Sequence, residues 1–215
     1  TLAAGMLLAA VVAGVLAPIV VVGNDFNRLL VTLGVVFLFH EAANKAHGLT
    51  GGADGLSSFT VGPLAGLFEF DFLGHTAFFY TLAGLVVAYL VVWRIATSPF
   101  GLALRGLREN TARMHAVGAL VSRHRAVAYV LSGALAGMAG AMLAQTSNFA
   151  SLDMLGFERS ADVVMMSALG GTGSIPGVIL GASLFTWLKD ALSSLSPKYW
   201  QLGVGLDVFL DGDDG

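Results

Sequence analysis

Long apolar stretches, separated by polar connections, follow one another along most of the chain. They cover about residues 2–22, 29–46, 76–95, 126–144, 154–173 and 175–192. A helix needs about 20 mainly apolar residues to cross a bilayer, so the pattern predicts an all-α integral membrane protein, a polytopic helix bundle of about six membrane segments. A further stretch at 200–210 is too short to cross and contains Asp207, so we interpret it as an incomplete last span.

A glycine-rich break separates the stretches at 154–173 and 175–192. It reads Gly170-Gly171-Thr172-Gly173-Ser174-Ile175-Pro176-Gly177. Gly and Pro destabilise the interior of a helix, so we expect two helices joined at this break. The break is not typical of a phosphate-binding loop, because no Lys follows the glycines and both flanks are apolar.

Composition narrows the classes of protein that fit this pattern. The 215 residues are 56% hydrophobic and 12% charged, with a mean hydropathy of +0.79, whereas soluble domains are about 25% charged. The apolar content excludes disorder, the absence of Cys excludes a disulfide framework, and the net charge of −3 argues against nucleic-acid binding. We expect a single transmembrane domain over residues 1–215. Because no basic region precedes the first apolar stretch and the chain begins at Thr1, we also expect a fragment of a longer protein without a signal peptide.

The basic residues indicate the orientation of the bundle. Six of the eleven Lys and Arg residues lie in the connection 96–125 or at its edge, with Glu109 as the one acid among them: Arg94, Arg105, Arg108, Arg113, Arg123 and Arg125. The positive-inside rule therefore places residues 96–125 in the cytoplasm. Alternation of the spans then places residues 47–75 outside.

The loop 96–125 contains an amphipathic pattern from Ser98 to Gly118. Ser98 and Pro99 are typical of a helix start, and Arg105, Glu109 and Arg113 form a row at a spacing of four residues. We expect one helix at the inner face of the membrane. Two hypotheses fit it: a connector that binds anionic lipid, and a docking helix for a groove on a cytoplasmic protein. The spacing leaves both open.

Four segments, in order along the chain, resemble the M-type permease subunit of branched-chain amino-acid ABC importers, to which urea-importer permeases are closely related. The resemblance covers about residues 26–203. The segments are Leu49-Thr-Gly-Gly-Ala-Asp-Gly-Leu56, Ser98-Pro-Phe-Gly-Leu-Ala-Leu-Arg-Gly-Leu-Arg-Glu-Asn110 with Ala116-Val-Gly118, Leu131-Ser-Gly-Ala-Leu-Ala-Gly-Met-Ala-Gly-Ala141, and Leu169-Gly-Gly-Thr-Gly-Ser-Ile-Pro-Gly-Val-Ile-Leu-Gly181. The acidic end, residues 206–215, departs from the family, whose members finish with an apolar helix and a basic tail.

The resemblance implies a multi-pass permease of the bacterial inner membrane that is not itself an enzyme. Its partners would be a second permease subunit, two ATP-binding subunits that carry ATP and Mg, and a periplasmic or extracellular substrate-binding protein; no cofactor is expected on this chain. Residues 96–125 would be the coupling loop to an ATP-binding subunit, with contacts at Arg105, Arg108, Glu109, Asn110, Arg113 and Gly118. The implied cargo is a branched-chain or related amino acid. A urea or short-amide importer is the alternative, and an ATP-independent secondary transporter or channel remains a rival.

The end of the second apolar stretch carries a polar group of residues, His40, Glu41 and Asn44. The spacing resembles a zinc-protease motif, but Asn44 replaces the second His, so we expect no metal site. Glu41 and Lys45 are spaced as an ion pair on one helix face. Polar groups in membranes avoid lipid, so His40, Glu41 and Asn44 either face the bundle interior or contact the substrate pathway.

Small residues are spaced for close helix packing in two places. One series is Gly133, Gly137 and Gly140, and the other is Gly173, Gly177 and Gly181. Small residues at this spacing let helix backbones approach each other in lipid; the other interpretation is that one face lines the translocation path or meets a partner permease. In the outer loop, Gly51, Gly52 and Gly55 are expected to adopt positive φ in a tight turn.

Overall fold

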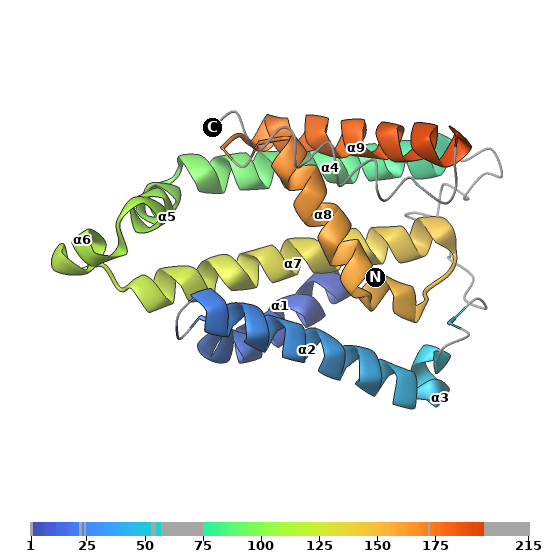
Figure 1. The fold of residues 1–215 in the computed structure, drawn as a ribbon, viewed down its shortest axis with the longest axis horizontal. Helices are drawn as coiled ribbons and strands as arrows, with labels where there is room; N and C mark the ends of the chain where they lie inside the picture. Colours follow the sequence, from blue (N-terminus) through green and yellow to red (C-terminus); the bar gives the residue numbers. More distant parts are fainter. Residues whose placement is uncertain are drawn as a thin grey trace. The chain divides into compact units, whose positions relative to one another are not determined.

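A computed structural model describes residues 2–21, 23, 25–52, 55–56, 75–171 and 173–195 (Figure 1). Apart from one isolated β-bridge, the regular structure of these residues is helical, which confirms the all-α class. The chain divides into unit 1, Thr1–Met154, and unit 2, Leu155–Gly215. The expected incomplete span at 200–210 lies outside the described residues.

Unit 1 is built from long apolar helices and three short ones. Its helices are α1 (Leu2–Val20), α2 (Asp25–Lys45), α3 (His47–Thr50), α4 (His75–Thr97), α5 (Pro99–Glu109), α6 (Thr111–Ala116) and α7 (Val121–Ser147). Within the described residues, α1, α2 from Phe26, α4 and α7 are long and apolar enough to cross a membrane. They coincide with the first four apolar stretches of the sequence. The helix α7 begins five residues before the stretch at 126–144, because Arg123, His124 and Arg125 extend it although they break the apolar pattern.

Unit 2 contains the helices α8 (Phe157–Leu169) and α9 (Ile175–Leu195), on either side of the glycine-rich break. The stretch 154–173 is not one continuous helix. The 3-10 helix η2 (Leu152–Leu155) precedes α8, and Gly156 between them is extended at φ −66° and ψ 148°. With 13 residues, α8 is about 20 Å long, which is shorter than the hydrocarbon core of about 30 Å.

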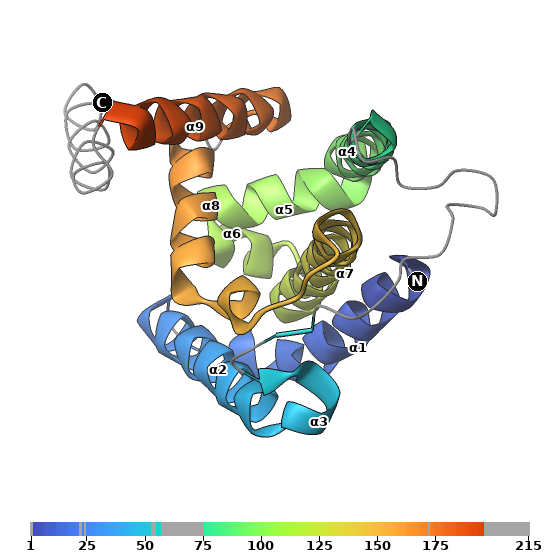
Figure 2. The same ribbon diagram turned by 90° about the vertical axis from the view of Figure 1, so that its right-hand side faces the viewer.

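The closest packing in unit 1 joins α1 to α7, which lies between α1 and α4 (Figure 2). A Cβ atom added to Gly133 would lie 2.6 Å from the Ala13 Cβ, and one added to Gly137 would lie 2.7 Å from the Gly5 carbonyl oxygen. Ala13 is 6% exposed. A seam of Gly and Ala therefore brings the two backbones together, which is how helices associate in lipid.

In unit 2 the last turn of α8 crosses the first turns of α9 at glycines. A Cβ atom added to Gly170 would lie 2.7 Å from the Gly177 carbonyl carbon, and one added to Gly181 would lie 2.5 Å from the Gly170 Cα. Further along, the Lys189 Nζ donates to Asp162 at 2.9 Å and joins the two helices. The analysis of the sequence did not predict this ion pair.

The remaining two glycines of the predicted packing series are in open space. A Cβ atom added to Gly140 or Gly173 would meet no described atom within 4 Å. Neither glycine therefore packs against another helix within the part of the chain that the structure describes.

Gly137→Ala tests the seam between α1 and α7. The added methyl group has no room, so we expect a destabilisation of about 1–3 kcal/mol and a lower thermal unfolding midpoint of the permease in detergent. Gly140→Ala, on the same helix, is the matched control and is expected to be neutral or stabilising, by up to about 1 kcal/mol. An equal loss of stability in Gly137→Ala and Gly140→Ala would contradict the conclusion that Gly137 packs in a seam between α1 and α7.

Candidate functional site

A sharp turn joins α4 to α5 at one end of unit 1. The Ser98 hydroxyl caps α5 by accepting a hydrogen bond from the Gly101 amide at 3.4 Å, and Pro99 occupies the first helical position. A Cβ atom on Gly101 would lie 2.5 Å from the Ile95 carbonyl oxygen. A residue with a side chain would open this turn, so Gly101 fixes the direction in which α5 leaves α4.

The loop helix is broken at Asn110. Asn110 is extended at φ −156° and ψ 97°, so α5 ends at Glu109 and α6 begins at Thr111. The Asn110 Oδ1 accepts from the Arg113 amide at 2.9 Å and caps α6. The expectation of one continuous helix from Ser98 to Gly118 is therefore wrong. Asn prefers helix caps because its side chain replaces the missing backbone partners.

Gly118 ends α6 and needs to be glycine. Its φ is +86°, its amide donates to the His115 carbonyl at 3.0 Å, and the next amide, of Ala119, donates to the Met114 carbonyl at 3.0 Å. This pair of bonds is the Schellman arrangement, in which a left-handed residue terminates a helix. The geometry gives Gly118 a structural role in the turn toward α7.

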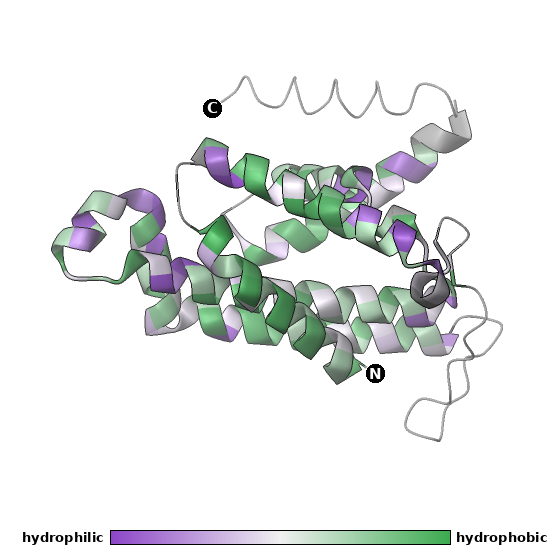
Figure 3. Ribbon diagram, turned by 90° about the horizontal axis from the view of Figure 1, so that it is seen from below, coloured by the Kyte–Doolittle hydropathy of each residue, from purple (hydrophilic) through white to green (hydrophobic). Residues whose placement is uncertain are grey.

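We call residues 99–118, which comprise α5, Asn110, α6 and the turn at Gly118, the elbow. Its predicted contact residues are exposed: Arg105, Arg108, Glu109, Asn110, Arg113 and Gly118. The elbow also has exposed apolar side chains, with Leu102 at 61% and Val117 at 79%. Figure 3 shows hydrophilic residues gathered at this end, while the long helices are mainly hydrophobic. Charged groups around exposed apolar ones suit a surface that docks another protein.

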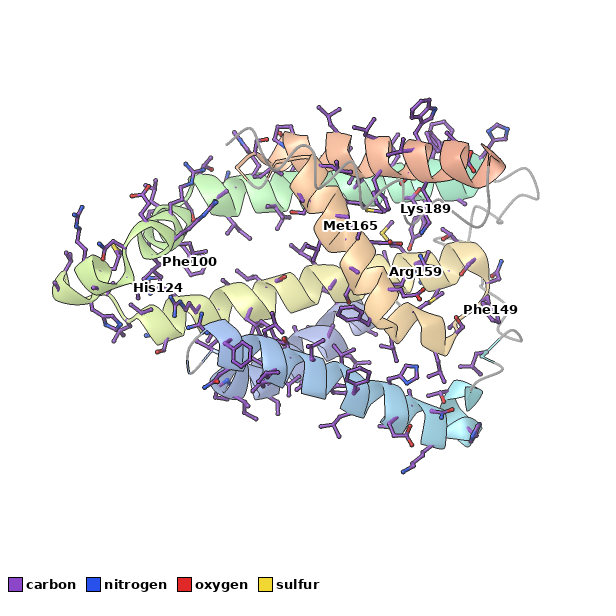
Figure 4. All side chains as sticks on the ribbon, viewed as in Figure 1. Phe100, His124, Phe149, Arg159, Met165 and Lys189 are labelled. Carbon is purple, nitrogen blue, oxygen red and sulfur yellow. The ribbon has the colours of Figure 1, made fainter. Side chains whose placement is uncertain are left out.

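The elbow is attached to the first turns of α7. The Arg125 Nη2 donates to the Thr111 Oγ1 at 3.2 Å, and the rings of Phe100 and His124 stack with centroids 5.8 Å apart (Figure 4). Sequence analysis missed these contacts. No local sequence pattern predicts the stacking of the two rings, because Phe100 and His124 are 24 residues apart on different helices.

The polar residues of α2 lie at the opposite end of unit 1 from the elbow, near α3 (Figure 1). Glu41 and Lys45 form the predicted ion pair at 3.4 Å. Both side chains are more than half exposed, so the pair contributes little stability. His40 and Asn44 are half-buried. No group of three or more metal-ligating side chains occurs among the described residues.

The loop after α3 contains a glycine turn held against the end of α7. Gly51, Gly52 and Gly55 have φ values of 72°, 57° and 71°, which confirms the predicted positive φ. Leu56 and Ala150 exchange two backbone hydrogen bonds, at 2.8 and 3.0 Å. A Cβ atom on Gly55 would lie 2.7 Å from the Ala150 carbonyl oxygen, so this contact also requires glycine.

The helices α4 and α7 meet at the end of unit 1 that is remote from the elbow. The Tyr80 hydroxyl donates to the Gln145 side-chain carbonyl, and Gly84 lies against the Met142 sulfur. Both helices that flank the elbow are therefore also joined to each other at their far ends.

Four apolar helices of spanning length among the described residues, two of them joined by the exposed charged elbow, indicate a multi-pass membrane protein. A family model described as "Branched-chain amino acid transport system / permease component" matches residues 1–209. The chain belongs to this family.

Curated relatives share about 30% of their residues with the chain. The high-affinity branched-chain amino acid transport permease LivM of Escherichia coli K12 is 28% identical over 87% of the chain and 49% of its own length, and LivM of Salmonella typhimurium is 31% identical over 64% and 32%. The autoinducer 2 import system permease LsrC of Klebsiella pneumoniae is 30% identical over 87% and 54%. The matched part of the chain thus spans between about a third and about half of the length of these relatives. No solved structure matches.

The cap at Asn110 generates a prediction for the elbow. Asn110→Ala removes the acceptor for the Arg113 amide, at a cost of about 1 kcal/mol. We expect hydrogen exchange of the amides in residues 111–118 to become about fivefold faster.

Asn110→Asp is the matched control, because a carboxylate still caps the helix and exchange should stay near the wild-type rate. If the Ala and Asp variants exchange alike, the cap does not hold the elbow.

Proposed function

We propose that the chain is the transmembrane permease region of an ATP-driven importer for branched-chain or related amino acids. In this proposal the elbow lies in the cytoplasm and docks on a separate ATP-binding subunit. The observation that carries the proposal is the exposed charged surface of the elbow, formed by Arg105, Arg108, Glu109, Asn110 and Arg113, in a chain of the permease family.

The attachments of the elbow explain how docking would move the bundle. The turn at Ser98 ties α5 directly to α4, and the Arg125–Thr111 bond ties α6 to α7. A displacement of the elbow by the ATP-binding subunit would therefore move two spanning helices, α4 and α7, at once. The substrate shifts the balance between inward-open and outward-open states only as far as it binds them with different affinity.

The proposed assembly contains further subunits. A second permease subunit completes the path, two ATP-binding subunits supply ATP and Mg, and an external substrate-binding protein delivers the cargo. The turn with Gly51, Gly52 and Gly55, next to the bonds between Leu56 and Ala150, is the proposed contact for the binding protein. Gly133, Gly137, Gly177 and Gly181 keep the helices packed while the bundle moves, and His40, Glu41 and Asn44 are the proposed polar residues of the path.

The class of substrate follows from the family description, which names branched-chain amino acids. Relatives named for autoinducer 2 import also match, so the fold serves more than one cargo. A urea or short-amide importer is the alternative for this chain. An ATP-independent transporter or channel is less favoured, because it leaves the charged elbow without a partner.

Charge reversal tests the docking surface. Arg108→Glu and Glu109→Arg place like charges against the partner, so we expect about a tenfold or greater loss of substrate-stimulated ATPase activity in the assembled complex. Arg94→Glu is the matched control, since Arg94 is exposed at the end of α4 but lies outside the elbow. Arg108→Lys should retain most of the activity.

Co-purification of the ATP-binding subunits verifies assembly in each variant. Normal ATPase activity in intact complexes of Arg108→Glu and Glu109→Arg would refute docking through these residues. An equally large loss of ATPase activity in Arg94→Glu would show that the loss comes from a general change of charge and not from the elbow.

The chain by itself is expected not to accumulate substrate. Reconstituted into liposomes without partners, it has neither an ATP-binding subunit nor a second permease, so uptake of radiolabelled leucine should equal that of empty liposomes. Uptake above that background would contradict the proposed division of labour and favour an ATP-independent transporter or channel.

A further inference from the structure

An apolar trough runs along unit 1 between α1 and α7 and continues to the elbow. Its first part is a hollow of about 560 Å³ lined by Gly14 and Pro18 of α1 and by Val130 of α7, among other residues. Its second part is a hollow of about 450 Å³ lined by Phe100 and Leu120, among others. Arg123 and Val127 line both parts, so the two hollows adjoin at these two residues.

Arg123 is the charged group of this trough. It lies in the first turn of α7, where it is exposed, and no described residue forms an ion pair or hydrogen bond with its side chain. Among the described lining residues of the two hollows there is no Asp or Glu. The neighbouring Arg125 is already bonded to Thr111, and His124 is stacked on Phe100, so Arg123 is the basic residue of this turn whose side chain has no partner among the described residues.

The shape and the chemistry of the trough match one kind of molecule. The wall between α1 and α7 is almost wholly apolar and lies within spanning helices, which suits an acyl chain. Arg123 lies at the helix end, where a phosphate headgroup is found, and basic pockets between spanning helices on the cytoplasmic side bind anionic lipid. The exposed hydroxyl of Ser122 adds a hydrogen-bond donor beside Arg123.

A helix of another subunit fits the trough less well. Cytoplasmic ends of spanning helices are rich in Lys and Arg, so a second helix in the trough would bring like charge toward Arg123. An anionic lipid brings the opposite charge.

We propose that the trough between α1 and α7 is a binding site for an anionic phospholipid, with the headgroup on Arg123 and an acyl chain along Val127, Val130 and Pro18. The proposal rests on the proposed function only for the leaflet, which is the cytoplasmic one. The bound lipid lies against the turn from α6 to α7, so it braces the base of the elbow.

Lipid titration of the permease in nanodiscs tests the site. The full-length permease is reconstituted in phosphatidylcholine with increasing phosphatidylglycerol, and its thermal midpoint is followed. We expect phosphatidylglycerol to raise the midpoint of the wild type, and Arg123→Gln to need about fivefold more of it for half the effect. Arg123→Lys should behave as the wild type, because the charge remains.

Two further variants make the result specific to the trough. Arg113→Gln removes the same charge from the elbow but lines neither hollow, so it should keep the wild-type response. Val127→Trp fills the trough at the apolar residue common to both hollows and should lose the response with Arg123 intact. Midpoints in pure phosphatidylcholine show that each variant is folded.

Three results would overturn the proposal. The wild type would show no preference for phosphatidylglycerol, or Arg113→Gln would lose the response as fully as Arg123→Gln, or a photo-crosslinker at residue 127 would capture a protein subunit in place of lipid. The titration needs no ATPase partner and no fixed sidedness. If the charge-reversal variants keep their ATPase activity while the lipid response is present, the proposed function is refuted and the lipid site is not. If those variants lose activity while the lipid response is absent, the lipid site is refuted and the proposed function is not.

Discussion

The contact between α1 and α7 is the constraint on which unit 1 depends. In a bilayer the hydrophobic effect does not drive helices together, because lipid tails are as apolar as the helix surfaces. Helix packing therefore relies on close approach of the backbones. Gly133 and Gly137 provide that approach, with Ala9, Ala13 and Gly5 on the other side. Because the first turns of α7 hold the elbow through Arg125 and His124, the seam also sets where the elbow lies relative to the bundle. A change in the seam would reach the elbow without any residue of the elbow being altered.

The elbow owes its form to two residues that end helices. Asn110 breaks the charged row of the sequence into two short helices, and Gly118 turns the chain toward α7 with a left-handed backbone. Arg108 and Glu109 therefore lie beside a corner and not in the middle of a straight helix. Two nearby arginines differ in what they contact: Arg125 bonds to Thr111 within the chain, whereas Arg123 lines the trough. This division separates the proposed docking of protein from the proposed binding of lipid.

Hydropathy was sufficient for the fold class, because lipid-facing helices must be apolar along their whole length. Local rules were sufficient to predict the positive φ of Gly51, Gly52 and Gly55 and the ion pair Glu41–Lys45, since these features depend on neighbours in sequence.

The break at Asn110 was missed, although an Asn followed by a short polar segment is itself a cap signal. The stacking of Phe100 on His124, the Tyr80–Gln145 bond and the Asp162–Lys189 pair join different helices, and no pattern within one helix predicts them. The length of α8 was overestimated because hydropathy does not register the extended backbone at Gly156.

The central claim is that the elbow lies in the cytoplasm and is covered by an ATP-binding subunit. The chain contains no Cys, so Arg108→Cys introduces one defined thiol that a membrane-impermeant maleimide can report. The account predicts no labelling in intact cells, labelling in inside-out vesicles stripped of the ATP-binding subunit, and protection when that subunit is restored. Labelling of residue 108 from outside intact cells would contradict the account.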